Sequence, residues 1–220
     1  MKNIYIGDIH GLTVWKQIVN DNPDFDNIVF IGDYLDSFNV SGEDQLKNLL
    51  NIIEFKKSNM NKVHLLIGNH DIHYWPGVDD NKTSGYQPSM KTIFTETFLQ
   101  NKDLFQMCVI IGNNLCTHAG VSEDFLNDTG YHTYDYISVD DYINKLFKHK
   151  ATEFLFDFYD YNDYENSLIY VNYPESNIEG TVGAINEYNL LIFQFVPEVN
   201  ESEINVSNLR ISSGIDDHIG

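Results

Sequence analysis

Three short apolar runs in the first half of the chain each lead into a polar loop that contains glycine. The runs cover residues 4–6, 28–31 and 63–67. After the first two loops, apolar residues recur at helical spacing, which predicts a helix around residues 14–19 and another at about 43–57, with Ser41 or Gly42 as a cap before it. Continuous apolar strands that alternate with helices are typical of a buried, largely parallel sheet.

The second half of the chain follows a looser pattern. Residues 73–88 indicate a loop or lid, and residues 153–166 mix aromatic with acidic side chains. That segment is either a substrate platform or a partly buried cap, and the cap is the favoured interpretation. The remaining predicted elements are helices at 90–99 and 139–147, a hairpin of strands 107–111 and 114–117 around a Gly112-Asn113 turn, and closing strands at 190–196 and 204–211. No linker divides residues 1–220, so we predict one domain.

Charge excludes one large class of partner. The chain carries 33 acidic and 13 basic residues, for a net charge of −20, and such a surface repels nucleic-acid phosphates. We therefore expect no binding of duplex nucleic acid. Arg210 is the only arginine in the sequence. A phosphate group would have to be held mainly by metal, histidine, asparagine, lysine or backbone N–H groups.

Composition also bears on location. No apolar stretch of the sequence approaches the roughly 18–20 residues that span a bilayer. The first residues lead directly to Asp8, without the apolar core of a signal peptide. These features predict a cytoplasmic protein that does not bind membranes. Cys108 and Cys116 form no CxxC pair, and we expect both to be reduced and buried.

The polar loops contain residues suited to binding divalent metal ions. Ligands in α/β folds bind beyond the carboxyl ends of the strands, where these loops would meet. Asp8 and His10 can reach the same ion, and carboxylate with imidazole suits manganese, iron or zinc. Asp33 follows the second strand and could bridge two ions, while Asn69 and His118 offer an oxygen and a nitrogen to the second ion. Two ions about 3.5–4 Å apart would bind phosphoryl oxygens and activate a bridging hydroxide for attack on phosphorus.

His70 follows the candidate ligand Asn69 and has a different predicted role. Asp36 could hydrogen-bond one of its ring nitrogens and favour the charged imidazolium. The pair would then protonate the leaving-group oxygen as a general acid. Each of these motifs is weak on its own. Their order, with each motif directly after an apolar strand, favours a functional site over a packing role.

Four segments resemble the motifs of the calcineurin-like metallophosphoesterases, and most closely the compact serine/threonine-phosphatase-like branch found in bacteria and phages. They are Gly7-Asp8-Ile9-His10-Gly11, Gly32-Asp33-Tyr34-Leu35-Asp36, Gly68-Asn69-His70-Asp71 and Thr117-His118-Ala119-Gly120. The resemblance implies an α/β fold (α+β by some schemes) of two facing mixed β-sheets flanked by helices, with a dinuclear metal centre at one edge. The implied roles are Asp8 and His10 on the first ion, Asp33 as the bridge, Asn69 and His118 on the second ion, and His70 as the acid oriented by Asp36.

The chain departs from that branch at three positions. Ser37 and Ile67 stand where its protein phosphatases carry phosphate-gripping arginines, which weakens the case for a phosphoprotein substrate. His73 could bind substrate in their place, together with Asn69, or could be a packing residue. Phe195 stands where the resemblance implies the last histidine of the second metal site, and phenylalanine cannot coordinate a metal.

Two hypotheses follow for the function. The leading one is an enzyme with two divalent ions, manganese first and iron, zinc or nickel as alternatives, that hydrolyses phosphate mono- or diesters. Its partner would be a phosphorylated small molecule or another phosphoester, with nucleotides and phosphoproteins among the candidates. The alternative is a degenerate member of the same fold that acts as a binding module with weak or no catalysis, because its second metal site lacks the last histidine.

Overall fold

The computed structural model describes residues 2–78, 84–121, 125–126, 129–131 and 137–154, together with the backbone of three strands at 181–185, 190–194 and 211–212. Its first sheet is parallel in every described strand pair. The strand order is β1 (Asn3–Ile6), β2 (Asn27–Phe30), β3 (Val63–Leu66) and β4 (Phe105–Gln106). The first three confirm the predicted apolar strands. The sequence does not predict β4, because two residues are too few to show a periodic pattern.

A second sheet is antiparallel in its described strands. In order they are β5 (Cys108–Ile111), β6 (Asn114–Thr117), β7 (Thr181–Ile185), β8 (Leu190–Gln194) and β9 (Ile211–Ser212). The β5–β6 pair confirms the predicted hairpin, whose turn places Gly112 at a φ of 64°. The strand predicted from residue 190 is also confirmed. Of the strand predicted at 204–211, only residue 211 is described.

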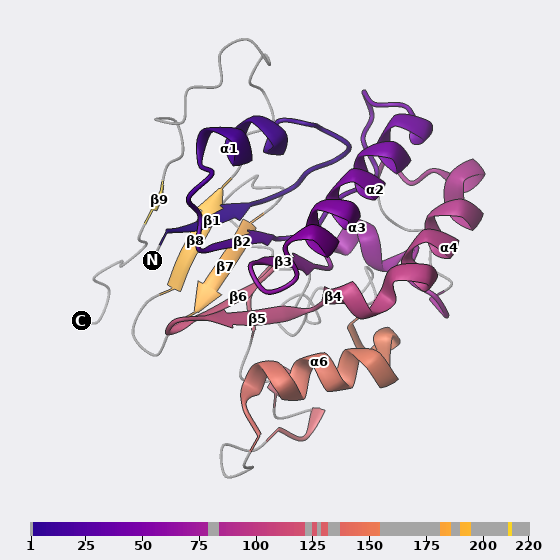
Figure 1. The fold of residues 1–220 in the computed structure, drawn as a ribbon. Helices are drawn as coiled ribbons and strands as arrows, with labels where there is room; N and C mark the ends of the chain where they lie inside the picture. Colours follow the sequence, from indigo (N-terminus) through magenta and orange to yellow (C-terminus); the bar gives the residue numbers. More distant parts are fainter. Residues whose placement is uncertain are drawn as a thin grey trace.

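Helices flank the sheets. They are α1 (Trp15–Asp21), α2 (Gly42–Ser58), α3 (Asn69–Ile72), α4 (Lys91–Asn101) and α6 (Val139–His149), with 3-10 turns at Pro88–Met90, Lys102–Leu104 and Ala151–Phe154. All but α3 and the 3-10 turns are predicted from the sequence. Ser41 caps α2 by accepting a hydrogen bond from the backbone N–H of Asp44 at 3.2 Å, as one of the two predicted caps. In Figure 1, α1 and α2 lie above the parallel strands and the β5–β6 hairpin lies below them. No helix in the described part of the chain is long and apolar enough to cross a membrane.

Both faces of the parallel sheet are buried, which explains its continuous apolar strands. Along β2, Ile28 and Phe30 point into a large cluster with the helices, whereas Val29 points into a smaller cluster. The smaller cluster joins side chains from both sheets, namely Tyr5, Val29, Ile31, Leu66, Val109, Ile111 and Cys116. Successive side chains of a strand point to opposite faces, so each strand contributes to two cores.

The predicted α/β class, with two facing sheets and flanking helices, is confirmed. The resemblance implies that each sheet is mixed, but in the described strands one sheet is parallel and the other is antiparallel. Cys108 and Cys116 are free and buried, as predicted. The loops after β1, β2 and β3 meet at the carboxyl edge of the parallel sheet, and the loop after β6 joins them there.

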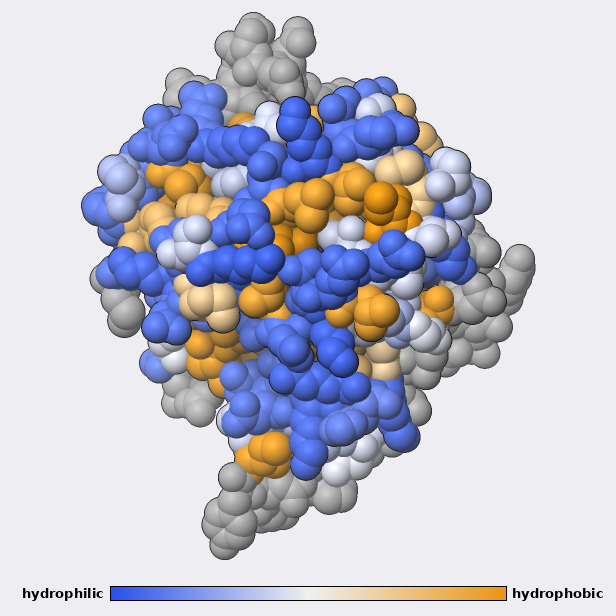
Figure 2. Space-filling view, turned by 45° about the vertical axis from the view of Figure 1, so that its right-hand side comes forward, coloured by the Kyte–Doolittle hydropathy of each residue, from blue (hydrophilic) through white to orange (hydrophobic). Residues whose placement is uncertain are grey.

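The described surface agrees with the acidic composition. Figure 2 shows mostly hydrophilic side chains on the face turned forward from the right of Figure 1, interrupted by hydrophobic bands. The large apolar side chains exposed on the described part of the chain are Phe38, Leu50, Met60, Ile93, Leu99 and Ile110. Single exposed apolar residues are ordinary on a protein surface and need no special explanation.

Candidate metal centre

The loops that follow β1, β2 and β3 are joined closely through their backbones. The N–H of His10 donates to the carbonyl of Asp33 at 2.7 Å, and the N–H of Gly11 donates to the carbonyl of Tyr34 at 2.9 Å. The loop after β3 approaches Asp33 so closely that a Cβ atom on Gly68 would lie 2.2 Å from Asp33 Oδ1. Glycine is therefore required at position 68 for the two loops to meet.

Asp71 ties the loops after β2 and β3 to each other. Its buried carboxylate accepts three backbone hydrogen bonds: Oδ2 from Asp33 at 2.7 Å and Gly68 at 3.0 Å, and Oδ1 from Tyr34 at 2.9 Å. The sequence does not predict this role for Asp71, because Asp33 and Tyr34 lie 38 and 37 residues away along the chain. The one sequence feature that points to Asp71 is its position at the end of the Gly-Asn-His-Asp segment.

Four non-glycine residues of the described chain adopt a positive φ, and all four are predicted site residues. They are Asp8 (35°), His10 (39°), Asp33 (55°) and Asp36 (65°). The left-handed region costs a residue with a Cβ atom on the order of 1 kcal/mol or more, and such conformations cluster at functional sites. The surrounding loops thus hold these side chains in positions that an unconstrained chain would avoid.

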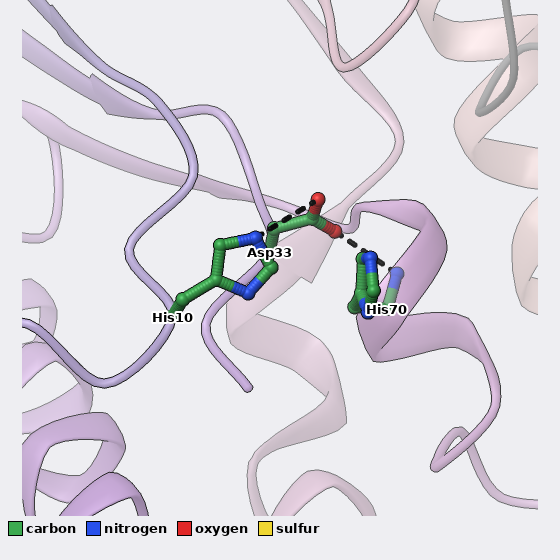
Figure 3. A group of neighbouring side chains, drawn as sticks. All are labelled: His10, Asp33 and His70. Carbon is green, nitrogen blue, oxygen red and sulfur yellow. Dashed lines mark hydrogen bonds and ion pairs between the residues drawn. The ribbon is translucent and has the colours of Figure 1, made fainter. Parts of the chain in front are cut away.

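Asp33 is at the centre of the cluster. Its Oδ1 accepts the backbone N–H of His70 at 2.9 Å, and its Oδ2 faces His118 Nε2 at 3.5 Å and His10 Nε2 at 3.9 Å. Figure 3 shows His10 and His70 on opposite sides of this carboxylate. The two nitrogen–oxygen distances are too long for good hydrogen bonds. They suit ligands of a shared ion, because atoms each about 2.0–2.2 Å from a metal lie roughly 3–4 Å apart.

A backbone carbonyl orients the ring of His10, and another orients the ring of His118. His10 Nδ1 lies 2.6 Å from the carbonyl oxygen of Leu35, and His118 Nδ1 lies 2.8 Å from that of Ile31. Because a carbonyl oxygen only accepts, Nδ1 carries the proton, and in the neutral ring the lone pair is on Nε2. Histidines that bind metals are commonly held in this way, which fixes both the tautomer and the direction of the ring.

Asp8 and Asp33 form a buried pair of carboxylates. Among the described residues, Asp8 Oδ1 is buried without a hydrogen-bond partner. Burial, and then the charge of Asp33, raise the pKa of Asp8. Burial also opposes the charge on Asp33, but His118, His70 and His10 together lower its pKa. A bound cation would stabilise such a pair and satisfy the unpaired oxygen, so the donor set fits a metal site.

The candidate ligands form two overlapping groups that share Asp33. One group consists of His10, Asp33 and His70, and the other of Asp8, Asp33 and His118, with the ligand atoms of each group within 4.8 Å of one another. The shared carboxylate is where the sequence analysis expects a bridge. The grouping differs from the expected ligand sets, because it pairs Asp8 with His118 and pairs His10 with His70, the expected acid.

Asn69 lies beside the second group. Its side-chain amide is 2.9 Å from His118 Nε2. With its nitrogen turned inward, the amide would also donate to Asp33 Oδ2 at 3.1 Å. A cation between these groups would favour the opposite orientation, with the amide oxygen inward, which is the one that a ligand role requires.

His70 is paired with Asp36. Its Nδ1 lies 3.2 Å from Asp36 Oδ2, and the two side chains are 14% and 0% exposed. Burial opposes a charge on His70, but Asp33 and the hydrogen bond to Asp36 raise its pKa to about 9. These neighbours favour the charged form of the ring, which is the form from which a general acid transfers its proton.

The structure gives less support to the other predicted contributors. His73 is 2% exposed, so its side chain lies within the protein, which favours the packing alternative. Phe195 lies outside the described residues, and so does the aromatic segment beyond residue 154. Phe154 itself is buried, in agreement with the cap interpretation for the start of that segment.

Comparison with known proteins identifies the family. The family model for calcineurin-like phosphoesterases matches residues 1–181 of the 220-residue chain. A search among curated proteins finds no match. The matched range covers the described parallel strands β1 to β4 and the loops after β1, β2, β3 and β6, in agreement with the resemblance of the four motifs. The chain therefore belongs to the calcineurin-like phosphoesterases.

Proposed function

We propose that the protein is a metal-dependent phosphoesterase that hydrolyses phosphate mono- or diesters of small molecules. Its family supports metal-dependent hydrolysis of phosphoesters in general. The observation that carries the proposal for this chain is the position of Asp33, whose Oδ2 faces the Nε2 atoms of both His10 and His118 at ligand-to-ligand distances. A structural packing role would not require two histidines to direct their lone pairs at one buried carboxylate.

The proposed ligands are Asp8, His10 and Asp33 for a first ion, and Asp33, Asn69 and His118 for a second. We favour manganese, with iron, zinc and nickel as alternatives, because these ions accept mixed carboxylate and imidazole ligands. When bound, the ions would polarise the phosphoryl oxygens and lower the pKa of the attacking water. The chain contributes rigidity: the backbone N–H of His70 holds Asp33 Oδ1, and Asp71 holds the backbone of Asp33.

His70 is the proposed general acid. Its Nδ1 faces Asp36, so Nε2 is the atom that would donate a proton to the leaving-group oxygen. The His70 ring also lies edge-on to the ring of His10, with centroids 4.9 Å apart. The proton would therefore be delivered next to a metal ligand, where the scissile ester would be bound.

Recognition of the phosphate would depend on the metal ions and on uncharged groups. Ile67 is buried in the apolar core, and the Ser37 hydroxyl accepts two backbone N–H bonds of its own loop, so neither replaces the arginines of the related branch. This favours small phosphorylated molecules over phosphoproteins. Asn69 would contact the phosphate, and a contact from His73 stays a prediction. The net charge of −20 argues against duplex nucleic acid as substrate, and a cytoplasmic location stays a prediction.

The test is hydrolysis of 4-nitrophenyl phosphate, bis(4-nitrophenyl) phosphate and phenyl phosphate by the purified chain with added Mn²⁺. We expect turnover that depends on the metal. Asp33→Asn should abolish turnover and reduce the bound metal. His70→Gln should leave the amount of bound metal unchanged. It should slow the hydrolysis of phenyl phosphate by about 100-fold or more, since a positioned general acid contributes roughly 10²–10⁴-fold to the rate.

Asp24→Asn is the matched control for the acidic substitution. The Asp24 side chain is 74% exposed and paired only with a surface lysine in the described contacts, so this variant should behave like the wild type. The enzyme proposal fails if the folded wild-type chain shows no turnover of a broad ester panel with Mn²⁺, Ni²⁺ or Zn²⁺.

A binding module with the same fold is the second candidate. It is favoured by Ser37, Ile67 and Phe195, each of which replaces a group that the catalytic branch uses. Elemental analysis of the metal-loaded chain separates the candidates. Two ions per chain would support the enzyme, none would support the module, and one would indicate an impaired catalyst.

A further inference from the structure

Tyr74 adds a third side chain to the pair of His70 and Asp36. Its hydroxyl donates to Asp36 Oδ1 at 2.5 Å, while Asp36 Oδ2 faces His70 Nδ1 at 3.2 Å. We propose that Tyr74 is a positioning residue for the general acid His70. Tyr74 holds the Asp36 carboxylate in the orientation that aligns the His70 ring. This inference rests on the proposed function, because it assigns a role within the same catalytic site.

Tyr74 is itself rigidly held. Its side chain is 0% exposed, stacks on Tyr86 with centroids 5.1 Å apart, and packs edge-on against Phe94, also at 5.1 Å. The backbone N–H of Gln87 donates to the Tyr74 hydroxyl oxygen at 2.9 Å. Because that oxygen accepts from Gln87, its own proton is directed to Asp36. Burial, and then the hydrogen bond to Asp36, raise the pKa of Tyr74, so the hydroxyl stays a donor at working pH.

Asp36 needs such support more than an ordinary residue does. Its backbone is in the left-handed region, at a φ of 65°, and its side chain is 0% exposed. The segment that carries Gln87 also passes directly over it, since a Cβ atom on Gly85 would lie 2.3 Å from the Asp36 carbonyl oxygen. Partners on both oxygens fix the plane of the group and therefore the direction of the bond to His70.

The proposed role has a kinetic signature. An ester with a basic leaving group needs a proton from the general acid, whereas 4-nitrophenolate departs readily without one. Misalignment of His70 should therefore slow the hydrolysis of esters with poor leaving groups more than that of esters with good ones. A purely structural role for Tyr74 would slow all substrates by the same factor.

The first experiment compares Tyr74→Phe with the wild type, both loaded with Mn²⁺. Phenylalanine keeps the ring between Tyr86 and Phe94 and removes only the hydroxyl. We expect kcat for phenyl phosphate to fall about tenfold, a fraction of the full general-acid contribution. For 4-nitrophenyl phosphate we expect a change of less than about twofold, and KM should be unchanged for both substrates.

The matched control is Tyr142→Phe, which also removes a tyrosine hydroxyl that donates a hydrogen bond, in this case to the carbonyl of Thr129. It should alter neither rate. In the Asp36→Asn background, Tyr74→Phe should have no further effect on leaving-group sensitivity, because Tyr74 acts through Asp36. Equal slowing of both substrates by Tyr74→Phe, or additive effects in the double variant, would overturn the inference.

A second measurement requires neither metal nor turnover, so it separates this inference from the proposed function. In the proton NMR spectrum of the chain without added metal, the Nδ1 proton of His70, assigned by its loss in His70→Gln, should exchange slowly with water. It should exchange much faster in Tyr74→Phe and remain slow in Tyr142→Phe. If Tyr74→Phe does not fold, the wild-type spectrum still decides. A slowly exchanging Tyr74 hydroxyl proton that shifts in Asp36→Asn supports the inference, and a rapidly exchanging one overturns it.

Discussion

Replacement of Asp71 by asparagine should loosen the loops after β2 and β3, although the two side chains have nearly the same shape. The carboxylate uses both oxygens as acceptors for three buried N–H groups, from Asp33, Tyr34 and Gly68. An asparagine has one acceptor oxygen and an NH₂ group that only donates. At least one backbone N–H must then face another donor.

The size of the effect follows from the arrangement of the bonds. If the amide oxygen takes the place of Oδ2, the bonds from Asp33 and Gly68 are kept and the N–H of Tyr34 is left unpaired. A hydrogen bond to a charged group contributes about 1.5–3 kcal/mol, and an unpaired buried donor costs about 1–3 kcal/mol. The opposite orientation of the amide leaves two donors unpaired. We therefore expect Asp71→Asn to lower the free energy of unfolding by about 3 kcal/mol.

Urea unfolding followed by circular dichroism measures this loss, with and without added Mn²⁺. The dependence of the free energy on urea should be unchanged, since the substitution does not change the surface exposed on unfolding. The gain in stability from Mn²⁺ should be smaller than in the wild type, because Asp71 holds the backbone of the bridging Asp33. Asp24→Asn should show no measurable change. A loss below about 1 kcal/mol for Asp71→Asn would refute the reasoning, because that is the contribution of one ordinary hydrogen bond.

Two further predictions concern pH and backbone geometry. Burial, and then Lys56, lower the pKa of His64 to about 4. Burial of the neutral ring therefore contributes its full stability above the unfolded-state pKa of about 6.5. That stability is lost as the pH falls toward 4, because the unfolded chain then binds a proton that the folded chain does not. Between pH 7 and 4.5 the wild type should lose about 1–2 kcal/mol more than His64→Gln in urea unfolding, a figure reduced for the partial exposure of the ring. Gly68→Ala should lower the unfolding temperature and the Mn²⁺ affinity, because its Cβ atom would lie 2.2 Å from Asp33 Oδ1. Gly112→Ala, whose Cβ atom meets nothing within 4 Å, should cost only about 1–2 kcal/mol for its positive φ and leave Mn²⁺ affinity unchanged.

The sequence predicts the parallel sheet and the meeting of its loops, because both depend on local patterns. The apolar runs that end at Ile6, Ile31 and Ile67 are followed at once by glycine and a polar residue, which marks the carboxyl end of a buried strand. The sequence does not predict β7, which contains Gly183 between apolar residues and has no strong alternation. Its place in the sheet is set by pairing with β6, which lies far earlier in the chain, and with β8, which follows it.

The supporting groups of the site are less accessible from sequence than the candidate ligands. Asp71 contacts Asp33 and Tyr34, and Tyr74 contacts Asp36, at separations of 37 or 38 residues, and neither spacing nor residue type reveals such contacts. The pairing of Asp8 with His118 depends in the same way on how two sheets face each other. Residue chemistry predicts which side chains are candidates, whereas tertiary packing decides which of them become neighbours.

The position of β1 has a consequence for the stability of the bound state. Within the described sheet β1 is an outer strand, and its residues Asn3, Ile4 and Tyr5 are only partly buried, whereas β2 and β3 are interior strands. Outer strands open in local fluctuations that cost less than global unfolding. Because Asp8 and His10 follow β1 directly, fraying of this one strand would withdraw both from the site while Asp33 stays in place. Dissociation of the first ion would then be controlled by a local opening of the amino-terminal strand, and bound metal would protect the amides of β1 from hydrogen exchange more than those of β3.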